Sequence, residues 1–332
     1  MRLGRWLPGG LNLWAGLALL VAGGLLLLWG WPTLPPAPFH YAREEIVPPG
    51  DPRLSGLGGQ FAAERGMRYV IGRGDSTVSL LVAEYRDPQG QPRHVVVYPP
   101  AGGPAVTDGN RMRSELWKKA AEAILKHTDS NALFLAWWDD AQRIDFYTGR
   151  PVWTSLPLAE AFADGEERQF WREVAGGFGE DREPLRQLAR WLTMDAEQAL
   201  AEMARRWPED RPVFLLVCLD DLARLTEIEA LSGTRLALEG RFFPNADDFH
   251  GQIAAVKRWA GESGGTGNYL LQPVPGAGIR AWRTTSPELD RTLLIRLLPF
   301  VRSVTDYPLG VKLVYQSDRG GYLSLFELRR PP

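Results

Sequence analysis

The chain has 332 residues, with 38 Lys or Arg against 40 Asp or Glu and a formal net charge of −2. Because the two signs are mixed along the sequence, there is no basic face, and nucleic acid is not expected as a partner. Apolar residues make up 45% and include 13 Trp, which is ample for a packed core. Cys218 is the single cysteine, so intramolecular disulfides, covalent c-type haem and cysteine-rich metal sites are excluded, and we expect no bound cofactor.

An apolar run from Leu11 to Trp31 contains no charged residue and follows Arg2 and Arg5. About 20 residues at a rise of about 1.5 Å cross a hydrocarbon core of roughly 30 Å, so the run predicts a transmembrane anchor after a short cytoplasmic segment, residues 1–10. A cleaved signal peptide is the alternative, but its apolar region would be only about 7 to 15 residues long. The positive-inside rule predicts a single-pass inner-membrane protein whose C-terminal part is periplasmic, if the host is a Gram-negative bacterium.

Prolines dominate the start of the next segment, which reads Pro-Thr-Leu-Pro-Pro-Ala-Pro over residues 32–38. Prolines at this density favour a stiff polyproline II spacer that holds a domain off the bilayer. We therefore assign residues 32–52 to a Pro-rich tether and residues 53–332 to one periplasmic α/β domain.

The first half of this domain predicts a β-meander followed by a β-to-α-to-β order. The expected strands are Met67–Gly72, Thr77–Tyr85 and His94–Tyr98, with turn chemistry at residues 87–90. A polar helix at Arg111–His127 then leads into an apolar strand, Ala132–Trp138. This order is typical of an α/β layer.

The second half predicts helices first and a closing hairpin last. Two or three helices are expected between Leu158 and Trp207, the last of them capped by Asp195. The remaining elements are expected as strands at 213–219, 236–242 and 269–272, helices at 222–231 and 252–260, and a hairpin of strands 311–316 and 322–328. The predicted fold class is α/β, with a mixed, partly parallel sheet flanked by helices.

A weak internal repeat joins two of these strands. The apolar strand 132–138 is followed by Asp139 and Asp140, and the apolar strand 213–219 is followed by Asp220 and Asp221. Ligands bind beyond the carboxyl ends of parallel strands, so four carboxylates there could hold a divalent cation or supply acid and base groups. The alternative is structural, because Asp in a first helical turn caps free amides and pairs with Arg four residues later, as Arg143 and Arg224 would.

Aromatic and ionisable residues concentrate around the first Asp pair. Trp, Tyr and Arg are enriched at binding hot spots, so this strand-to-helix corner predicts a recognition surface, with core roles equally open. The binding candidates are Trp137, Trp138, Asp139, Asp140, Arg143, Tyr147, Arg150, Asp220 and Asp221. If the strand continues through both Trp residues, their rings point to opposite faces and at least one lies in the core.

Other potential sites carry weaker signals. The four His residues show no metal-ligand spacing, and Cys218 inside an apolar strand is expected to act as a small buried hydrophobe. The run 261–267 is rich in Gly but follows a helix, the opposite order from a phosphate-binding loop. No catalytic residue and no metal ligand is predicted.

The corner Phe134–Ile144, continued by Tyr147–Arg150, resembles the hydroxylamine oxidation protein HaoB family. The tail Tyr307–Gln316, the single predicted span and the chain length also fit that family. The resemblance implies a membrane-anchored accessory protein that accompanies the octahaem hydroxylamine oxidoreductase of ammonia and methane oxidisers, and hence a role in hydroxylamine oxidation and nitrification. It brings no catalytic residues.

Two functions of different classes follow. The favoured one is a non-enzymatic accessory protein that docks, assembles or couples a soluble periplasmic multihaem oxidoreductase at the membrane. The alternative is a membrane-anchored periplasmic hydrolase or small-ligand enzyme with a carboxylate crevice at Asp139, Asp140, Asp220 and Asp221. The alternative requires the two repeated strands to be adjacent and parallel, since only then do the carboxylates converge.

Overall fold

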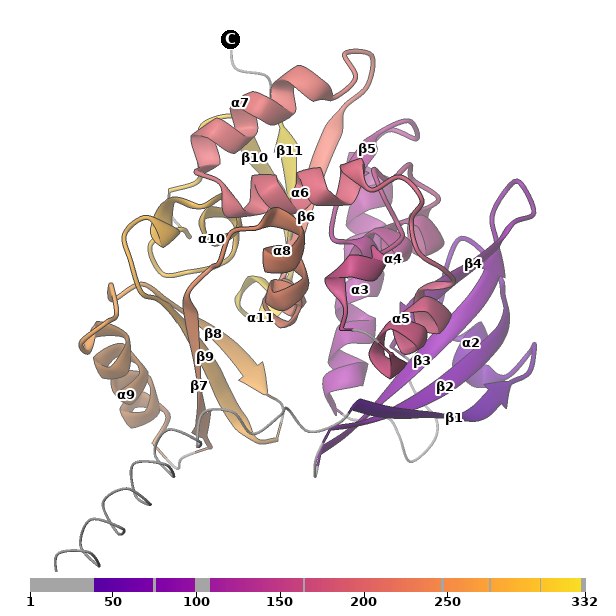
Figure 1. The fold of residues 1–332 in the computed structure, drawn as a ribbon, viewed down its shortest axis with the longest axis horizontal. Coiled ribbons are helices and arrows are strands. Elements are labelled where there is room, and N and C mark those ends of the chain that lie inside the picture. Colours follow the sequence, from indigo (N-terminus) through magenta and orange to yellow (C-terminus); the bar gives the residue numbers. More distant parts are fainter. Residues whose placement is uncertain are drawn as a thin grey trace, which may run out of the picture.

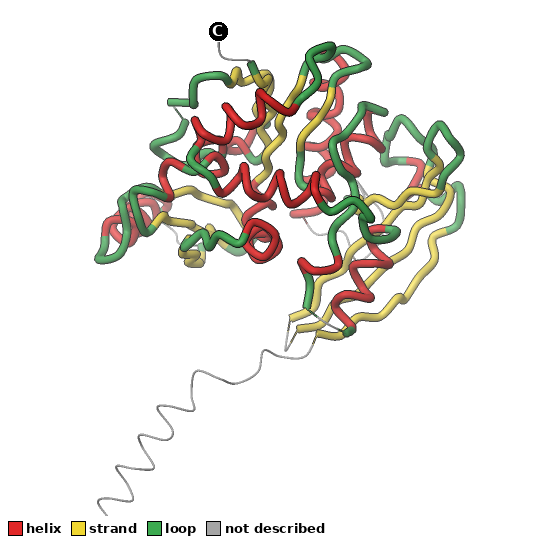
Figure 2. The backbone as a smooth tube through the Cα atoms, turned by 45° about the horizontal axis from the view of Figure 1, so that its top comes forward, coloured by secondary structure: helices red, strands yellow, loops and turns green. Residues whose placement is uncertain are grey.

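The computed structural model describes residues 39–73, 76–98, 108–163, 165–245, 248–274, 276–304 and 306–329. These residues form a mixed α/β fold in which the strands gather in three sheets separated by helices (Figure 2). One sheet contains a parallel pair, so the expectation of a partly parallel sheet is confirmed, although a single sheet was expected. The predicted anchor, Leu11–Trp31, lies outside the described residues, and none of the described helices is long and apolar enough to cross a bilayer.

The first sheet is an antiparallel meander in the order β1-β2-β3-β4 (Figure 1). Its strands are β1 (Phe39–Val47), β2 (Ala63–Arg73), β3 (Ser76–Arg86) and β4 (Pro92–Val97). Asp87 builds the predicted turn between β3 and β4, because its carboxylate accepts hydrogen bonds from the backbone N–H groups of Gln89 and Gln91 at 3.0 and 2.8 Å. The turn ends at Gly90, whose φ of 78° favours glycine.

Strand β1 corrects the predicted tether. Residues 39–47 were assigned to the Pro-rich tether, yet they pair with β2 from Phe39 opposite Arg73 to Val47 opposite Gly66. The short helix α2 (Pro52–Ser55) follows, capped by Asp51. These residues therefore belong to the folded part of the protein.

Helices cover both faces of the first sheet. On one face, α5 (Glu166–Ala175) packs Phe170 against Tyr69 at a ring-centroid distance of 5.8 Å. On the other face, α4 (Trp138–Thr148) packs Phe146 against Tyr85 at 5.1 Å. The sheet is thereby fixed against α4, which begins at the Trp and Asp residues of the predicted recognition corner.

The central sheet has the order β10-β11-β6-β5. Its strands are β5 (Leu133–Leu135), β6 (Val213–Cys218), β10 (Val311–Gln316) and β11 (Leu323–Leu328). Strand β6 is fully buried, as its continuous apolar run predicts, and it pairs in parallel with β5 and antiparallel with β11. The predicted strand 132–138 is shorter than expected, because the chain leaves the sheet after Leu135 and starts α4 at Trp138.

Helices pack around the central sheet, and α6 and α8 cross in front of β6 in Figure 1. Asp195 caps α7 as predicted, accepting a hydrogen bond from the N–H of Glu197 at 3.1 Å. The helix expected at 222–231 is instead a 3₁₀ helix followed by an α-helix. The elements are α3 (Asp108–His127), η2 (Ala159–Ala161), α6 (Glu183–Thr193), α7 (Ala196–Arg206), η3 (Leu219–Arg224), α8 (Leu225–Ser232), η4 (Leu289–Arg291), α10 (Leu293–Leu297) and α11 (Asp318–Gly321).

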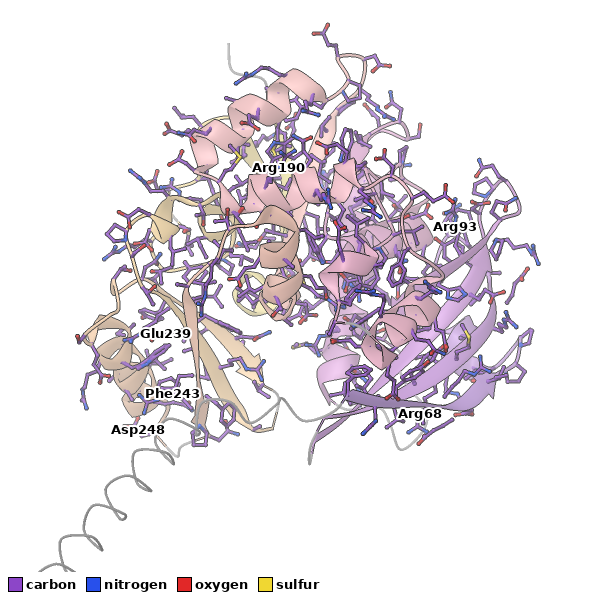
Figure 3. The ribbon with its side chains drawn as sticks, viewed as in Figure 1. Arg68, Arg93, Arg190, Glu239, Phe243 and Asp248 are labelled. Atoms are coloured by element: carbon purple, nitrogen blue, oxygen red, sulfur yellow. The ribbon has the colours of Figure 1, made fainter. Side chains whose placement is uncertain are left out.

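The third sheet is antiparallel, in the order β7-β9-β8, and includes one strand that the sequence pattern did not predict. Its strands are β7 (Leu238–Pro244), β8 (Tyr269–Val274) and the unpredicted β9 (Gly278–Thr284). Helix α9 (Phe249–Gly261) covers one face, where Trp259 packs on Phe243 at 5.8 Å. Figure 3 labels Phe243 and Glu239 on β7 in this part of the molecule.

Candidate functional site

The two repeated strands are adjacent and parallel. Leu133 of β5 lies opposite Val213 of β6, and Leu135 lies opposite Leu215. Both strands therefore end at the same edge of the central sheet, where α4 starts at Trp138 and η3 starts at Leu219. The geometric condition for convergence of the two Asp pairs is met.

Arg143 lies at the centre of the first corner. Its guanidinium contacts Asp140 Oδ1, lies 3.4 Å from Asp139 Oδ2, and donates from Nε to the Val96 carbonyl at 3.0 Å. The Arg143 side chain is 2% exposed, and both carboxylates are also buried. The predicted pairing of Asp139 with Arg143 four residues later therefore forms, but inside the protein.

Two arginines in this corner lie against aromatic rings. The Arg143 guanidinium carbon is 5.0 Å from the centre of the Tyr98 ring and 5.4 Å from that of Trp117. Arg224 lies 4.6 Å from Trp171 and also donates to Asp139 Oδ2 at 3.0 Å. Such contacts favour Arg, because its planar guanidinium can stack on an aromatic ring while its N–H groups donate hydrogen bonds in the plane of the group.

Glu227 binds the indole groups of both Trp residues in the first corner. Its Oε2 accepts hydrogen bonds from the indole N–H groups of Trp137 at 3.2 Å and Trp138 at 2.9 Å, and its Oε1 accepts from Arg224 at 2.9 Å. The two indoles converge on one carboxylate because the strand has ended before them. Both rings are buried, so both belong to the core.

The second corner is built differently. Asp220 accepts two hydrogen bonds from Arg113 of α3, both 3.0 Å long, and one from the hydroxyl of Tyr322. Asp221 instead accepts the backbone N–H of Cys218 at 2.9 Å, which caps η3. The predicted pair of Asp220 with Arg224 does not form. The Asp220 and Arg113 side chains are 20% and 28% exposed, so water reaches this end of the cluster.

The first carboxylate of each Asp pair is held ionised. Burial raises the pKa of Asp139, but the charges of Arg224 and Arg143 outweigh it and lower that pKa below its usual range. Burial likewise acts on Asp220, and Arg113 outweighs it, so the pKa of Asp220 is also lowered. Ion pairing therefore wins over desolvation at both positions.

The second carboxylate of each pair has a raised pKa and therefore takes up a proton more readily. Burial, followed by the charge of Asp139, raises the pKa of Asp140 to about 7. Burial and the charge of Asp140 raise the pKa of Asp221 well above its usual range. Asp139, Asp220 and Glu227 lie against the guanidinium groups of Arg113, Arg143 and Arg224, and burial raises the pKa of Glu227 as well. We refer to these eight residues as the buried ion network.

The buried ion network is suited to holding charge and protons rather than to open chemistry. Its arginines occupy the carboxylate oxygens that a cation would need, and no group of three or more His, Cys, Asp or Glu among the described residues could hold a metal ion. Cys218 is buried, and burial raises the pKa of its thiol well above the usual range, so the thiol stays protonated. No reactive nucleophile is found at this edge of the sheet within the described residues.

The remaining binding candidates lie along α4 and just beyond it. Tyr147 is buried, and its ring stacks on Trp117 at 6.4 Å. Arg150 is partly exposed and donates to the Thr128 carbonyl at 3.0 Å. Sequence reasoning missed four members of the site, because each comes from a distant element: Tyr98, Arg113, Glu227 and Tyr322.

A family model described as HaoA-associated protein HaoB matches residues 9–328, which is nearly the whole chain. The chain belongs to this family. The resemblance seen in the strand-to-helix corner and in the C-terminal tail is therefore confirmed. The matched residues end at Leu328, the last residue of β11, so the match includes all three sheets and the buried ion network.

Comparisons beyond the family add little. No curated protein matches the sequence. Among solved structures, the C. jejuni pglb C-terminal domain is similar over 64% of this chain and 100% of that chain, at 8% sequence identity and a TM-score of 0.39. A likeness this weak carries no argument about fold or function.

Proposed function

We propose that this protein is a membrane-anchored periplasmic accessory protein that docks HaoA at the inner membrane. Family membership carries the proposal, because the family is described by its association with HaoA and its model matches residues 9–328. The apolar run at 11–31 and the prolines after it supply an anchor and a spacer by sequence.

The burial of the recognition corner limits which of its residues can meet a partner directly. Trp137, Trp138, Arg143 and Tyr147 are all buried, so they support the surface rather than form it. Arg113 and Asp220 are the most exposed members of the buried ion network, at 28% and 20%, followed by Arg224 at 16%. We therefore place the docking contact at this end, where an ion pair on a polar rim can steer a charged partner.

A carboxylate enzyme is the second candidate, and one observation favours it. Strands β5 and β6 are adjacent and parallel, so Asp139, Asp140, Asp220 and Asp221 do converge at one edge of the sheet. Against it, three arginines neutralise this edge and most of it is closed to water. The accessory role therefore fits the described residues better.

Co-purification tests the docking proposal. The tagged full chain, extracted from native membranes in mild detergent, is expected to retain HaoA, detected by haem staining and mass spectrometry. Arg113→Glu should remove most of the retained HaoA, because it reverses a charge at the reachable end of the network. Lys119→Glu is the matched control, since Lys119 lies on the same helix, is 58% exposed and pairs with Asp318 outside the network.

Two results would contradict the docking proposal. One is a wild-type chain that retains no haem protein under conditions that keep it folded. The other is equal loss of HaoA from the Arg113 and Lys119 variants, which would point to general surface charge rather than to this site. Topology is tested separately: protease added to spheroplasts should digest residues 53–332, and protection of these residues would overturn the periplasmic placement.

A further inference from the structure

A small cavity lies beside α4, and none of its lining residues belongs to the buried ion network. It has a volume of about 50 Å³, is partly open to solvent, and is lined by residues of β3, β4, α4, the end of α5 and the loop at Ser155. Tyr85, Arg93, His94, Gln142 and Asp145 line it. Figure 3 labels Arg93 on β4, at this side of the molecule. Since one water needs about 10 to 15 Å³ by the same measure, the cavity suits a ligand of very few non-hydrogen atoms.

Gln142 leaves an acceptor unused beside this cavity. The residue is 4% exposed, and its Nε2 donates to the carbonyls of Ser155 at 2.9 Å and Ala175 at 3.1 Å. Two carbonyl acceptors fix the orientation of the amide, because Oε1 in the same place would face oxygen. The Gln142 Oε1 atom is buried and has no hydrogen-bond partner among the described residues. A buried acceptor of this kind is costly unless a donor meets it.

Asp145 contributes a carboxylate that makes no ion pair among the described residues. Its Oδ2 accepts the hydroxyl of Tyr85 at 2.6 Å, and no basic side chain among the described residues lies within 4.0 Å of it. The nearby Arg93 is already paired with Asp87 at 2.9 Å. His94 Nδ1 donates to the Glu173 carbonyl at 2.9 Å, and its Nε2 lies 3.4 Å from Glu84. Burial raises the pKa of Asp145, and the hydrogen bond from Tyr85 and the charge of Arg93 offset this rise only in part.

We propose that this cavity binds a small ammonium-type cation, such as ammonium or methylammonium, with N–H groups directed to Asp145 and Gln142. The size of the cavity, the unused acceptor and the carboxylate without an ion pair all favour a compact, positively charged donor. A quaternary ammonium ion has no N–H group and would satisfy only the charge, and an anion would meet Asp145. The cavity is separate from the docking contact, so its occupancy does not depend on HaoA.

Thermal unfolding of the full chain in nanodiscs tests the proposal with three chloride salts at constant ionic strength. Ammonium and methylammonium are expected to raise the melting temperature in a saturable way, because a ligand that binds only the folded state stabilises it. Tetramethylammonium carries the same charge but has no N–H donor and is too large, so it should give no saturable shift. Ligands of one or two non-hydrogen atoms bind weakly, and we expect half-saturation in the millimolar range.

The variant Asp145→Asn keeps the size of the side chain and should raise the half-saturating ammonium concentration at least tenfold. Asp129→Asn is the matched control, because Asp129 is exposed and does not line the cavity. Three results would each overturn the proposal and leave the cavity to water. They are equal shifts with all three salts, an unchanged response in Asp145→Asn, and no saturable shift up to about 50 mM. The salt series on the wild-type chain decides the question even if Asp145→Asn does not fold.

Discussion

The strand-to-helix corner after β5 is buried, whereas the corner after β6 is partly exposed at Asp220. Both begin with an apolar strand and two Asp residues, yet α4 continues for three turns against the first sheet while η3 is a short 3₁₀ helix beside the C-terminal hairpin. The first corner is neutralised by Arg143 from its own helix and by Arg224. The second is neutralised by Arg113 from α3, at the surface.

A common electrostatic pattern survives this difference. In each corner the first Asp lies beside an arginine and is ionised, and the second lies deeper and has a raised pKa. The repeat thus places the ionised carboxylate before the more readily protonated one in each corner, while the surrounding elements determine which arginine pairs with it. Helix capping explains only Asp221, so the structural alternative accounts for part of the repeat and the buried ion network accounts for the rest.

The largest expected effect on stability concerns Trp138 and Leu219, the residues at which α4 and η3 begin. Trp138 and Leu219 are both fully buried, but Trp138 also donates to Glu227 and contacts Arg224. Trp138→Ala should lower the free energy of unfolding by about 3 to 5 kcal/mol. Leu219→Ala should cost about 2 to 3 kcal/mol, because it removes less volume and strands no polar group. Urea unfolding followed by circular dichroism measures both, and a larger loss for Leu219→Ala would contradict this view of the corners.

The next effect compares the arginines of the two corners. Arg143→Ala leaves Asp139 and Asp140 buried beside an empty space, which should cost about 3 to 4 kcal/mol. The loss is moderated because Arg224 still pairs with Asp139 and Asp140 can take up a proton. Arg113→Ala should cost about 1 to 2 kcal/mol, since water reaches Asp220. Arg190→Ala on α6, labelled in Figure 3, is the surface control and should change stability by less than about 0.5 kcal/mol. Equal losses for Arg143 and Arg113 would show that the two corners do not differ in burial.

The position of the site could be predicted from the sequence, but most of its contacts could not. Two apolar strands ending in Asp pairs indicate one shared edge, and the parallel pairing of β5 and β6 confirms it. The pairing of Asp220 with Arg224 was wrong because a 3₁₀ helix has about three residues per turn, so residues four apart do not share a face. Arg113 and Tyr322 are about 100 residues from Asp220 in sequence, and only the packing of α3 and β11 brings them together.

The same reasoning explains the errors in the fold. The predicted tether was too long because residues 43–45 are charged and follow a proline run, yet such residues suit an edge strand that is solvated on one side. Strand β9 was not predicted because Arg283 stands at a buried position, where its charge breaks the apolar alternation set by Ile279 and Ala281. Arg283 reaches the third sheet's covered face and pairs with Glu239 at 2.7 Å, which no local pattern signals.

The contributions of Asp140 and Asp220 to stability should depend on pH in opposite ways. A carboxyl group whose pKa is raised on folding, as that of Asp140 is to about 7, stabilises the protein fully below its unfolded pKa of 3.8, and this contribution is lost as the pH rises through about 7. Asp220 behaves in the opposite way: its lowered pKa contributes stability above 3.8 that is lost as the pH falls below that value. Between pH 5 and 7.5, Asp140→Asn should therefore flatten the fall in stability by at most about 1.4 kcal/mol per pH unit, whereas Asp220→Asn should leave that slope unchanged. Equal slopes in the wild type and Asp140→Asn would place the protonated group elsewhere.

The smallest effect concerns Arg150, the partly exposed end of the predicted recognition corner. Its guanidinium donates to the carbonyl and hydroxyl of Thr128 and makes no ion pair among the described residues. Arg150→Ala should therefore cost no more than about 1 kcal/mol of stability, the net value of a partly exposed hydrogen bond. If Arg150 also contacts HaoA, the variant should weaken retention of HaoA at unchanged melting temperature, a combination that Arg143→Ala cannot give because it destabilises the core. A melting temperature that falls as far for Arg150→Ala as for Arg143→Ala would make the whole corner structural and would leave Arg113 and Asp220 as the remaining docking contact.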